Sequence, residues 1–268
     1  MPEHLTSRNN PRVKDAVKLK QRRQRERQGR FFIDGVREID RALNAGLAIV
    51  EAFVCESLCT ADEAQTLAKR LEKQAKEYFT VTPDVFEKLC FGERTDGVLA
   101  VAATPKHTLE DIELPERPLI AVLEGLEKPG NIGAALRSAD GAGLDAVIVA
   151  NPGTDLFNPN TVRASLGTVF GGNIATATSE EAISWLRSHE LPAYAARPEA
   201  NHRYDSVIYQ HGAAIVLGSE AEGLTDTWYG AGVTAIGLPM HGIADSLNVS
   251  ATAAVLFYEA RRQWDRSS

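Results

Sequence analysis

Short apolar runs alternate with helix-like patterns along almost all of the 268 residues, and this alternation limits the fold more than any other feature. In the first hundred residues it predicts helices at 7–27, 36–45, 61–77 and 83–89, and strands at 31–33, 49–55, 78–81 and 98–103. Six stronger strands follow, at 119–123, 146–149, 174–176, 193–195, 213–217 and 233–236, with helices at 131–142, 159–169, 179–188 and 225–229. This pattern indicates an α/β fold, and the second set indicates a mostly parallel sheet covered on both faces.

A proline-rich stretch separates the two sets. Residues 104–118, TPKHTLEDIELPERP, hold three prolines and show neither a helical nor a strand period, which is typical of a linker. We therefore predict a smaller α/β domain over residues 1–104, a linker over 105–118 and a larger α/β domain over 119–268.

Composition excludes several classes of protein. An apolar fraction of 44% with 24% charged residues is normal for a soluble globular protein, and no apolar run is long enough to span a membrane. The polar, basic start of the chain does not resemble a secretion signal. Cys55, Cys59 and Cys90 are too few and too irregularly spaced for a disulfide framework, and no histidines accompany them at zinc-ligand spacing. We expect a cytoplasmic protein with core cysteines and no bound metal.

The net charge of −7 conceals a strongly basic start. Residues 1–30 contain ten Lys or Arg and three acidic residues, an excess of +7, so the rest of the chain carries −14. Segregated charge of this kind indicates contact with a polyanion such as a nucleic acid. A solvated basic helix or a flexible arm is the alternative. The candidate contact residues are Arg8, Arg12, Lys14, Arg22 and Arg23.

The stretch 123–143, LEGLEKPGNIGAALRSADGAG, follows a predicted strand and opens a helix, a place where backbone amides can bind an anion or a cofactor. Gly130 and Gly133 fall within the turn, but no third glycine completes a dinucleotide-binding fingerprint. Arg137 stands alone among Ala, Leu and Ser residues. It is either a buried partner for a carboxylate or a cation directed at a phosphate.

A second glycine loop, IVLGSEAEGL at 215–224, joins a strand to a predicted helix. Gly218 and Gly223 allow a sharp turn and a close approach to a ligand. Because Glu220 and Glu222 repel phosphate, the loop suits an adenosine or a cationic group better than a phosphate chain. An ordinary strand-to-helix turn is the alternative.

The third stretch, IGLPMHGIADSLNVSATAAVLFYEARRQ at 236–263, combines a loop containing Pro and Gly with a predicted helix. Asp245 or Ser246 is predicted to cap this helix, which leaves backbone N–H groups of its first turn available to a ligand. Apolar residues recur at the spacing of one buried helical face, at Leu247, Ala251, Ala254, Val255 and Tyr258. Taken alone, the stretch is also compatible with an ordinary C-terminal helix.

Together and in this order, the three stretches resemble the motifs of the SpoU/TrmH family of RNA ribose 2′-O-methyltransferases, within the SPOUT class. The matching elements are NxGxxxR followed by Ser-Ala-Asp, LGSExEGL, and LPMxGxxDSLNVSxA, over residues 118–264. SRNNPRVK and RFFIDG resemble the start of the L30e-like substrate-binding domain of two-domain members, such as 23S rRNA guanosine methyltransferases and the thiostrepton-resistance enzyme. Departures are small. Glu127-Lys128 precedes the proline where an acidic residue alone is common, and Ser138 replaces a common Thr.

The resemblance implies a trefoil-knotted C-terminal domain that binds S-adenosylmethionine in the knot and transfers its methyl group to a ribose 2′-hydroxyl. It places Arg137 at the family's catalytic arginine. Because a free Arg is a poor base, we expect it to bind the phosphate beside the target ribose and polarise the hydroxyl. The other polar active-site positions are Asn131, Glu220, Ser246 and Asn248. The resemblance assigns cofactor binding to Leu217, Gly218, Leu238, Met240 and Leu247.

The resemblance also implies an RNA substrate, with a 23S-type rRNA guanosine favoured over tRNA, and a homodimer formed through the C-terminal domain. Apolar residues on several sides of the last helix support pairing, namely Leu256, Phe257, Tyr258 and Trp264. Two other hypotheses are a non-catalytic RNA-binding module with the same fold and a dehydrogenase with a degenerate cofactor motif. The retained polar residues disfavour the first, and the missing third glycine and the acidic loop disfavour the second.

Overall fold

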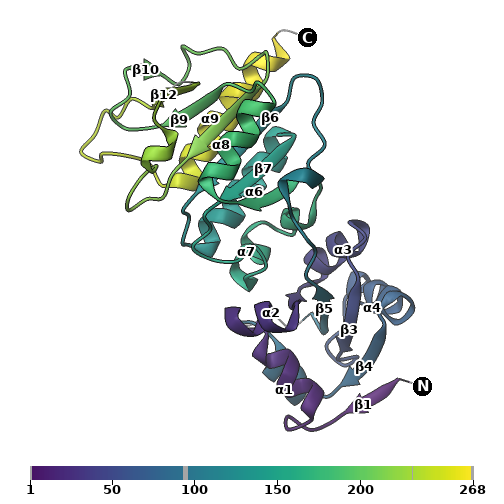
Figure 1. Cartoon of the computed structure of the whole chain (residues 1–268). Helices are drawn as coiled ribbons and strands as arrows, with labels where there is room; N and C mark the ends of the chain where they lie inside the picture. The colour runs from purple at the N-terminus through teal and green to yellow at the C-terminus, as the bar shows by residue number, and fades with distance from the viewer. Residues whose placement is uncertain (1, 93–95, 231, 267–268) are drawn as a thin grey trace. The chain divides into compact units, whose positions relative to one another are not determined.

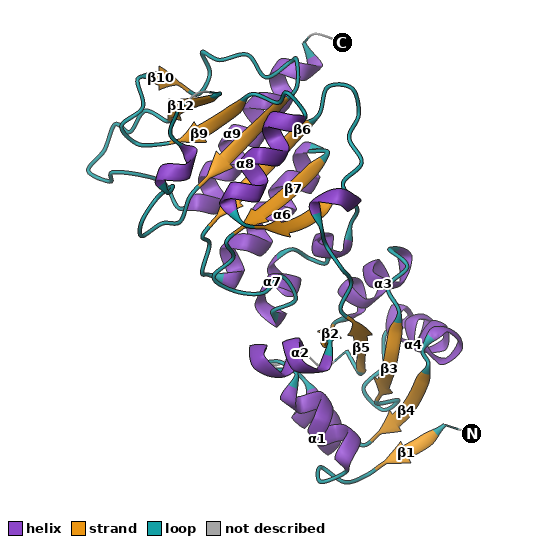
Figure 2. Cartoon of the chain, viewed as in Figure 1, coloured by secondary structure: helices purple, strands orange, loops and turns teal. Residues whose placement is uncertain are grey.

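The computed structural model of the chain describes residues 2–92, 96–230 and 232–266. Its packing divides into two compact units, each built of strands and helices (Figures 1 and 2). The first unit comprises Met1–Lys106 and Asp155–Phe170, and the second comprises His107–Thr154 and Gly171–Ser268. The α/β class predicted from the sequence is confirmed.

The first unit is built on a five-stranded mixed sheet with the strand order β1-β4-β3-β5-β2. β1, β4 and β3 pair in parallel, whereas β5 pairs antiparallel with both β3 and β2. Its strands are β1 (Glu3–Leu5), β2 (Arg30–Asp34), β3 (Ile49–Val54), β4 (Glu77–Val81) and β5 (Val98–Ala103). Its helices before residue 106 are α1 (Pro11–Lys18), α2 (Arg22–Gln28), α3 (Val36–Asn44), α4 (Asp62–Gln74) and α5 (Pro83–Leu89).

The basic start of the chain is part of this unit's core. The single helix predicted over 7–27 forms as two helices, because the chain turns at 19–21 and buries Leu19 completely. Asn10 caps α1 by accepting a hydrogen bond from the Arg12 backbone N–H, and Gly29 ends α2 in the left-handed conformation. Val13 is also buried, and β1 pairs with β4. The alternative of a flexible arm is therefore wrong.

A segment from the second half of the sequence completes the first unit. α7 (Pro159–Ala164) and a short 3₁₀ turn (Thr168–Phe170) pack here, although the sequence placed residues 119–268 together. The ring of buried Phe31 stacks on Phe157 and Phe170, with centroids 4.2 and 6.0 Å away. The side chain of Arg25, only 4% exposed, forms an ion pair with Asp155 at 2.6 Å. Through these contacts residues 155–170 join the core of the first unit, which the sequence pattern did not predict.

The second unit is built on a seven-stranded sheet with the order β10-β12-β9-β11-β6-β7-β8. Every pairing in it among the described residues is parallel, which confirms the predicted mostly parallel sheet. Its strands are β6 (Leu119–Glu124), β7 (Ala146–Ala150), β8 (Ile174–Ala177), β9 (Ala193–Ala196), β10 (His202–Arg203), β11 (Ala213–Leu217) and β12 (Val233–Gly237). Its helices are α6 (Pro129–Ala142), α8 (Ser179–Ser188) and α9 (Val249–Asp265), with 3₁₀ turns at Leu109–Asp111 and Asp226–Trp228.

Helices cover both faces of this sheet. Figure 1 shows α8 in front of the strands and α9 behind them. Alternate strand residues such as Ile120, Val122 and Val216 pack in one buried cluster with Leu186 of α8. On the other side α9 packs against α6, whose buried face includes small residues that allow a close approach.

Two expectations about the last helix are wrong. Asn248, and not Asp245 or Ser246, caps α9 by accepting a hydrogen bond from the Ser250 backbone N–H at 3.0 Å. The buried face of α9 consists of Val249, Ala253, Leu256, Phe257, Ala260 and Gln263. The residues predicted to be buried remain partly exposed, because a second apolar stripe one helical step away is the one that is buried, although the Tyr258 hydroxyl lies near Gly141 of α6. Leu247, Val255 and Tyr258 are 40%, 37% and 54% exposed.

The cysteines lie inside the first unit, as expected from their number and spacing. Cys55, Cys59 and Cys90 are all buried and unpaired. Burial raises the pKa of Cys59 to about 11 and that of Cys90 to about 12, so both remain protonated at neutral pH. Within the described part of the chain, no helix is long and apolar enough to cross a membrane.

Candidate functional site

A pocket opens in the second unit beside the carboxyl ends of β9, β11 and β12. These three strands are neighbours in a parallel sheet, so their ends meet at one edge, where ligands of open α/β sheets bind. The pocket is lined by Ala196, Arg197, Pro198, Leu217, Gly218, Ser219, Glu220, Gly223, Ile236, Leu238, Met240, Asp245, Ser246, Leu247, Val249 and Thr252. Its cavity volume is about 210 Å³, and the cavity is open to solvent at its mouth.

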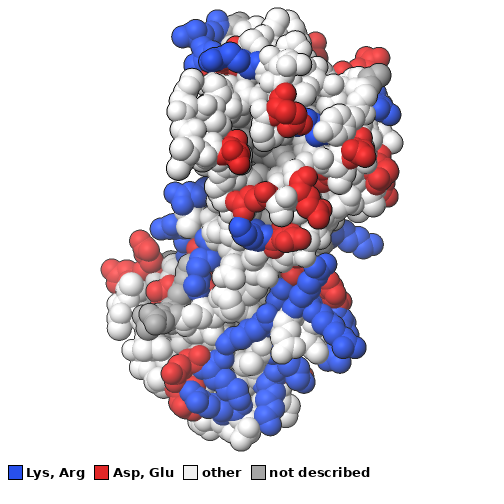
Figure 3. Space-filling view, turned by 90° about the vertical axis from the view of Figure 1, so that its left-hand side faces the viewer, with Lys and Arg blue, Asp and Glu red and all other residues white. Residues whose placement is uncertain are grey.

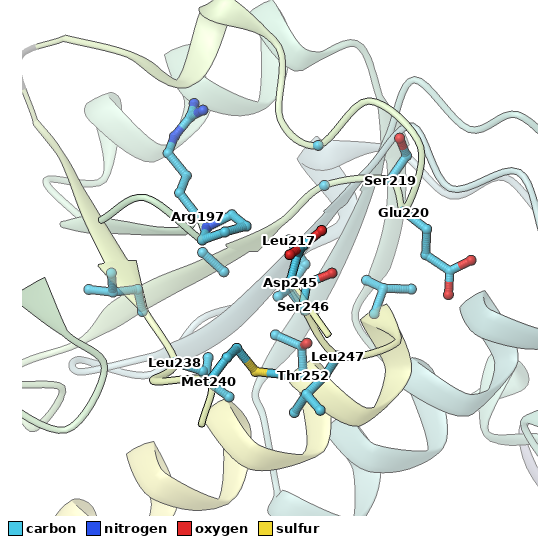
Figure 4. Close-up of a pocket in the computed structure, with 16 residues that line it drawn as sticks. Arg197, Leu217, Ser219, Glu220, Leu238, Met240, Asp245, Ser246, Leu247 and Thr252 are labelled. Atoms are coloured by element: carbon cyan, nitrogen blue, oxygen red, sulfur yellow. The ribbon is translucent and has the colours of Figure 1, made fainter. Parts of the chain in front are cut away.

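The pocket has apolar walls and a polar edge. Figure 4 shows Leu238 and Met240 on one side and Ser219 and Glu220 on the other, with Thr252 at the start of α9. Apolar walls exclude water from a bound ligand, while a few polar groups fix its orientation.

The glycine loop after β11 is closed by its own backbone. Ser219 and Gly223 exchange backbone hydrogen bonds of 3.1 Å in both directions. A Cβ added to Gly218 would lie 2.3 Å from the carbonyl carbon and oxygen of Gly223, so only glycine fits there. Gly223 itself has φ +70°, in the region that favours glycine. The two glycines predicted to shape a ligand loop therefore close it against itself.

A buried carboxylate holds the far end of this loop. Glu124, at the end of β6, is 1% exposed. It accepts hydrogen bonds from the Thr225 backbone N–H at 2.8 Å, from the Thr225 hydroxyl at 2.7 Å and from Ser179 of α8. Because an unsatisfied buried carboxylate would cost several kcal/mol, these donors fix the position of residue 225 against the sheet.

A second polar network joins the three sequence motifs. The amide of Asn248 donates to the Glu220 carboxylate and lies 3.4 Å from the Asn131 side-chain oxygen. The Lys128 ammonium also donates to Glu220. That bond, ahead of smaller contributions from Asn131 and the Val249 backbone, lowers the pKa of Glu220. Glu220 therefore remains an ionised acceptor at neutral pH.

Arg197 forms another part of the pocket wall. It is 7% exposed, and its guanidinium carbon lies 3.5 Å from the centroid of the Tyr229 ring. Figure 4 shows its guanidinium directed away from the apolar residues of the pocket. This stacking holds the segment after β9 to the segment that follows the glycine loop.

Arg137 lies apart from this pocket. It is exposed on α6, does not line the pocket, and makes no hydrogen bond or ion pair with any residue that the structure describes. The alternative of a buried partner for a carboxylate is therefore wrong. The guanidinium remains available to an anion from outside the chain.

Comparisons with known proteins identify the family. A model of the SpoU rRNA Methylase family matches residues 118–258, more than half of the chain. The chain belongs to this family. A model of the MRM3-like substrate binding domain matches residues 10–100 of the same SpoU family member. This family match excludes the dehydrogenase hypothesis.

Relatives of the SpoU chain match over nearly its whole length. The 23S rRNA (guanosine(2553)-2′-O)-methyltransferase RlmP of Bacillus subtilis is 24% identical, over 97% of this chain and 99% of its own. A crystal structure of an RNA 2′-O ribose methyltransferase is 42% identical with a TM-score of 0.84, over 97% and 98% of the two chains. An AdoMet-bound rRNA methyltransferase from Sinorhizobium meliloti is 27% identical with a TM-score of 0.88, over 97% of each chain.

The pocket brings together most of the site residues predicted from the SpoU motifs. All five residues assigned to the cofactor line it, as do Glu220 and Ser246. Asn131 and Asn248 lie beside it through the Glu220 network, whereas Arg137 does not. The sequence did not predict that Arg197 lines the pocket or that Lys128 donates a hydrogen bond to Glu220. The position of Arg197, just after a strand of a parallel sheet, is the one signal that could have marked it.

The basic residues predicted to contact RNA fall into two groups. Arg8 pairs with Asp84 and Glu87, Arg12 with Glu77 and Glu51, and Arg22 with Glu26. Lys14 and Arg23 are exposed and have no such partner within the described residues, and Arg27 is a third exposed cation of this kind. On the face shown in Figure 3, Lys and Arg side chains gather over the first unit.

No group of three or more His, Cys, Asp or Glu side chains within the described part of the chain is arranged to hold a metal ion.

Gly218→Ala is expected to abolish the closed loop, because its Cβ meets backbone atoms that cannot move without opening the Ser219–Gly223 pair. Titration calorimetry with S-adenosylmethionine should show an affinity at least tenfold lower, about 1.4 kcal/mol. Gly130→Ala is the matched control, because a Cβ at that position of α6 has open space. Equal affinities in the two variants would show that the closed loop does not shape the pocket.

Asn248→Asp is expected to separate the two roles of this residue. The carboxylate keeps the oxygen that caps α9, so the free energy of unfolding, measured by thermal denaturation, should change by less than about 0.5 kcal/mol. It loses the amide donor and places a second negative charge against Glu220, so methyl transfer to RNA should fall by roughly 10- to 100-fold. Asn248→Ala should also lose about 1 kcal/mol of stability. Full activity in Asn248→Asp would show that methyl transfer does not depend on the hydrogen bond from Asn248 to Glu220.

Proposed function

We propose that this SpoU family member transfers a methyl group from S-adenosylmethionine to a ribose 2′-hydroxyl of ribosomal RNA. The observation that carries the proposal is the network in which Asn131, Glu220 and Asn248, one from each motif, meet beside a closed glycine loop. Similar chains that cover nearly its full length are an rRNA 2′-O-methyltransferase and an AdoMet-bound rRNA methyltransferase.

The pocket fits the cofactor. Its apolar residues, among them Leu217, Leu238 and Leu247, can enclose an adenosine, and the carboxylates of Glu220 and Asp245 complement a positively charged ligand. S-adenosylmethionine supplies an activated methyl group on a sulfonium. The protein therefore needs no covalent nucleophile. Its task is to exclude water, to align the acceptor hydroxyl and to assist loss of its proton.

Arg137 is assigned to the RNA side of the reaction. Its exposed guanidinium has no partner within the described residues and lies outside the pocket, so it is available to a phosphate beside the target ribose. Its high pKa makes it a poor proton acceptor. We assign it to binding that phosphate and polarising the 2′-hydroxyl, while Asn131, Glu220, Ser246 and Asn248 orient the target nucleotide and the loops.

The first unit is assigned to RNA binding. Its match to a substrate-binding domain and the exposed cations Lys14, Arg23 and Arg27 support this role. Arg8, Arg12 and Arg22 already pair with carboxylates, so each contributes less net charge toward RNA. We propose a 23S-type rRNA guanosine as the target, as in the Bacillus subtilis relative, with tRNA as the second candidate, and cytoplasmic action.

A homodimer and a knotted second unit complete the proposal. Val255 and Tyr258 of α9 are 37% and 54% exposed, and Leu247, just before the helix, is 40% exposed. Exposed apolar side chains of this kind are typical of an interface, and a two-fold pair would place both copies of them together. The trefoil knot follows from the family resemblance and is retained as part of the proposal.

Substitution of Arg137 tests the activity. We expect wild-type protein to add one methyl mass to 23S rRNA, at a guanosine whose 3′ linkage becomes resistant to alkaline hydrolysis. Arg137→Ala should abolish this transfer while its S-adenosylmethionine affinity stays within tenfold, roughly 1.4 kcal/mol. Arg137→Lys keeps the positive charge but loses the planar guanidinium with its several N–H donors, so it should restore only a small part of the activity.

The outcomes separate the hypotheses. RNA binding without any methyl transfer by wild-type protein would favour the non-catalytic RNA-binding module. Transfer to tRNA alone, or to a uridine, would correct the target. A large loss of cofactor affinity in Arg137→Ala would show that the residue acts on the cofactor side.

The dimer is tested by mass in solution. Light scattering at micromolar concentration should give about twice the 29.1 kDa chain mass. Tyr258→Glu should shift the mass toward the monomer, because it places a charge among the partly exposed apolar side chains of α9. Ile208→Glu alters another exposed apolar side chain, 58% exposed and outside α9, and should leave the mass unchanged. A wild-type monomer that methylates RNA at full rate would refute pairing.

A further inference from the structure

We propose that Lys128, which pairs with the pocket residue Glu220, is an RNA-binding residue that donates to Glu220 and to an RNA phosphate at the same time. The inference rests on the proposed function and deepens it, because it adds a second phosphate contact to the one assigned to Arg137. Lys128 places a cation beside the Glu220 carboxylate of the polar network.

The position of Lys128 is unfavourable for the helix that it begins. Lys128 is the N-cap residue of α6 and makes no capping hydrogen bond. Ser, Thr, Asp and Asn are the residues that stabilise such a position, and a cation there opposes the positive end of the helix dipole. The side chain is therefore not explained by the stability of α6.

The ion pair leaves most of the ammonium accessible. The Lys128 side chain is 71% exposed, whereas that of Glu220 is 27% exposed. An ammonium has three N–H donors, and the described residues accept one of them, at Glu220. Exposed ion pairs contribute at most about 1 kcal/mol, so the pair by itself is a weak reason for a Lys at this position.

The negative charge around the pocket gives the Lys128 ammonium a second role, in attracting RNA. Glu220 and Asp245 line the pocket, and Glu222 is exposed in the same loop as Glu220. Among the described residues of the pocket wall, Arg197 is the only Lys or Arg, and it is 7% exposed and stacked on Tyr229. An RNA backbone that approaches this edge therefore meets carboxylates first. A cation fixed on Glu220 converts that repulsion into attraction.

A bridging Lys128 also keeps Glu220 in place when RNA arrives. Glu220 accepts from both Lys128 and Asn248, so the ammonium holds the carboxylate toward the network while its other donors face solvent. A phosphate bound to those donors would lie next to the residues that orient the target nucleotide. Together with a phosphate on Arg137, it would fix the register of the RNA strand at two points.

The test compares charge variants of the full-length protein on the 23S rRNA transcript that the wild type methylates. Lys128→Ala should weaken RNA binding by about three- to tenfold and lower the slope of log K against log salt by about one. Lys128→Arg should restore both quantities, and Lys128→Glu should weaken binding further. S-adenosylmethionine affinity, measured without RNA, should stay within about twofold of the wild type in Lys128→Ala and Lys128→Arg.

Two reference variants set the scale of these changes. Arg187→Ala removes one exposed cation from α8, away from the pocket, and should leave the slope and the RNA affinity nearly unchanged. The triple variant Lys14→Ala, Arg23→Ala, Arg27→Ala removes three exposed cations of the first unit and should lower the slope by about three if all three contact RNA.

The proposal is overturned if Lys128→Ala leaves the salt slope unchanged, which would make the ion pair purely structural. It is also overturned if that variant loses cofactor affinity tenfold, which would place Lys128 on the cofactor side, or if it methylates RNA faster, which would make Lys128 an obstacle. These results all require an active wild type. Absence of methyl transfer by the wild type would instead refute the proposed function.

Discussion

The parallel pairing of β12, β9 and β11 is the constraint on which the pocket depends. Because these neighbouring strands run in one direction, three segments distant in sequence, after residues 196, 217 and 237, leave the sheet at the same edge. Each segment then supplies one wall of the pocket. β6 pairs with β11 on the other side, so α6, which follows β6, begins beside the same edge. The register of the backbone thus assembles a site that no single stretch contains.

Two buried features turn this edge into a defined cavity. Gly218 allows the loop after β11 to close upon itself, and Glu124 holds the residue at which that loop returns to the sheet. The carboxylate is 1% exposed, so displacement of Thr225 would remove two of its three donors and leave it with Ser179 alone. Rigidity of this kind favours binding, because the loop has little conformational freedom to lose when a ligand enters.

The sequence predicted the strands, the parallel sheet and the loops of the pocket, because apolar runs and glycines report local backbone states directly. It could not choose between two apolar stripes on α9, since periodicity shows that a face is apolar but not which neighbour covers it. It also could not place residues 155–170, whose Phe157 stacks on Phe31 of the first unit. Arg8 and Arg12 carried the expected charge, but their carboxylate partners lie about 40 to 80 positions away in sequence.

The structure of α9 changes the residues from which pairing is inferred. If Leu247, Val255 and Tyr258 faced the core, the apolar residues left outside would include Leu256 and Phe257, from which pairing was predicted. In the structure Leu256 and Phe257 occupy the core position, with 0% exposure, and the first set remains partly exposed. The helix therefore buries one apolar face and leaves Val255 and Tyr258 of another face partly exposed, although the Tyr258 hydroxyl lies near Gly141 of α6. Exposure of these two side chains to water is costly unless another surface covers them, and a second copy of the chain presents the same side chains.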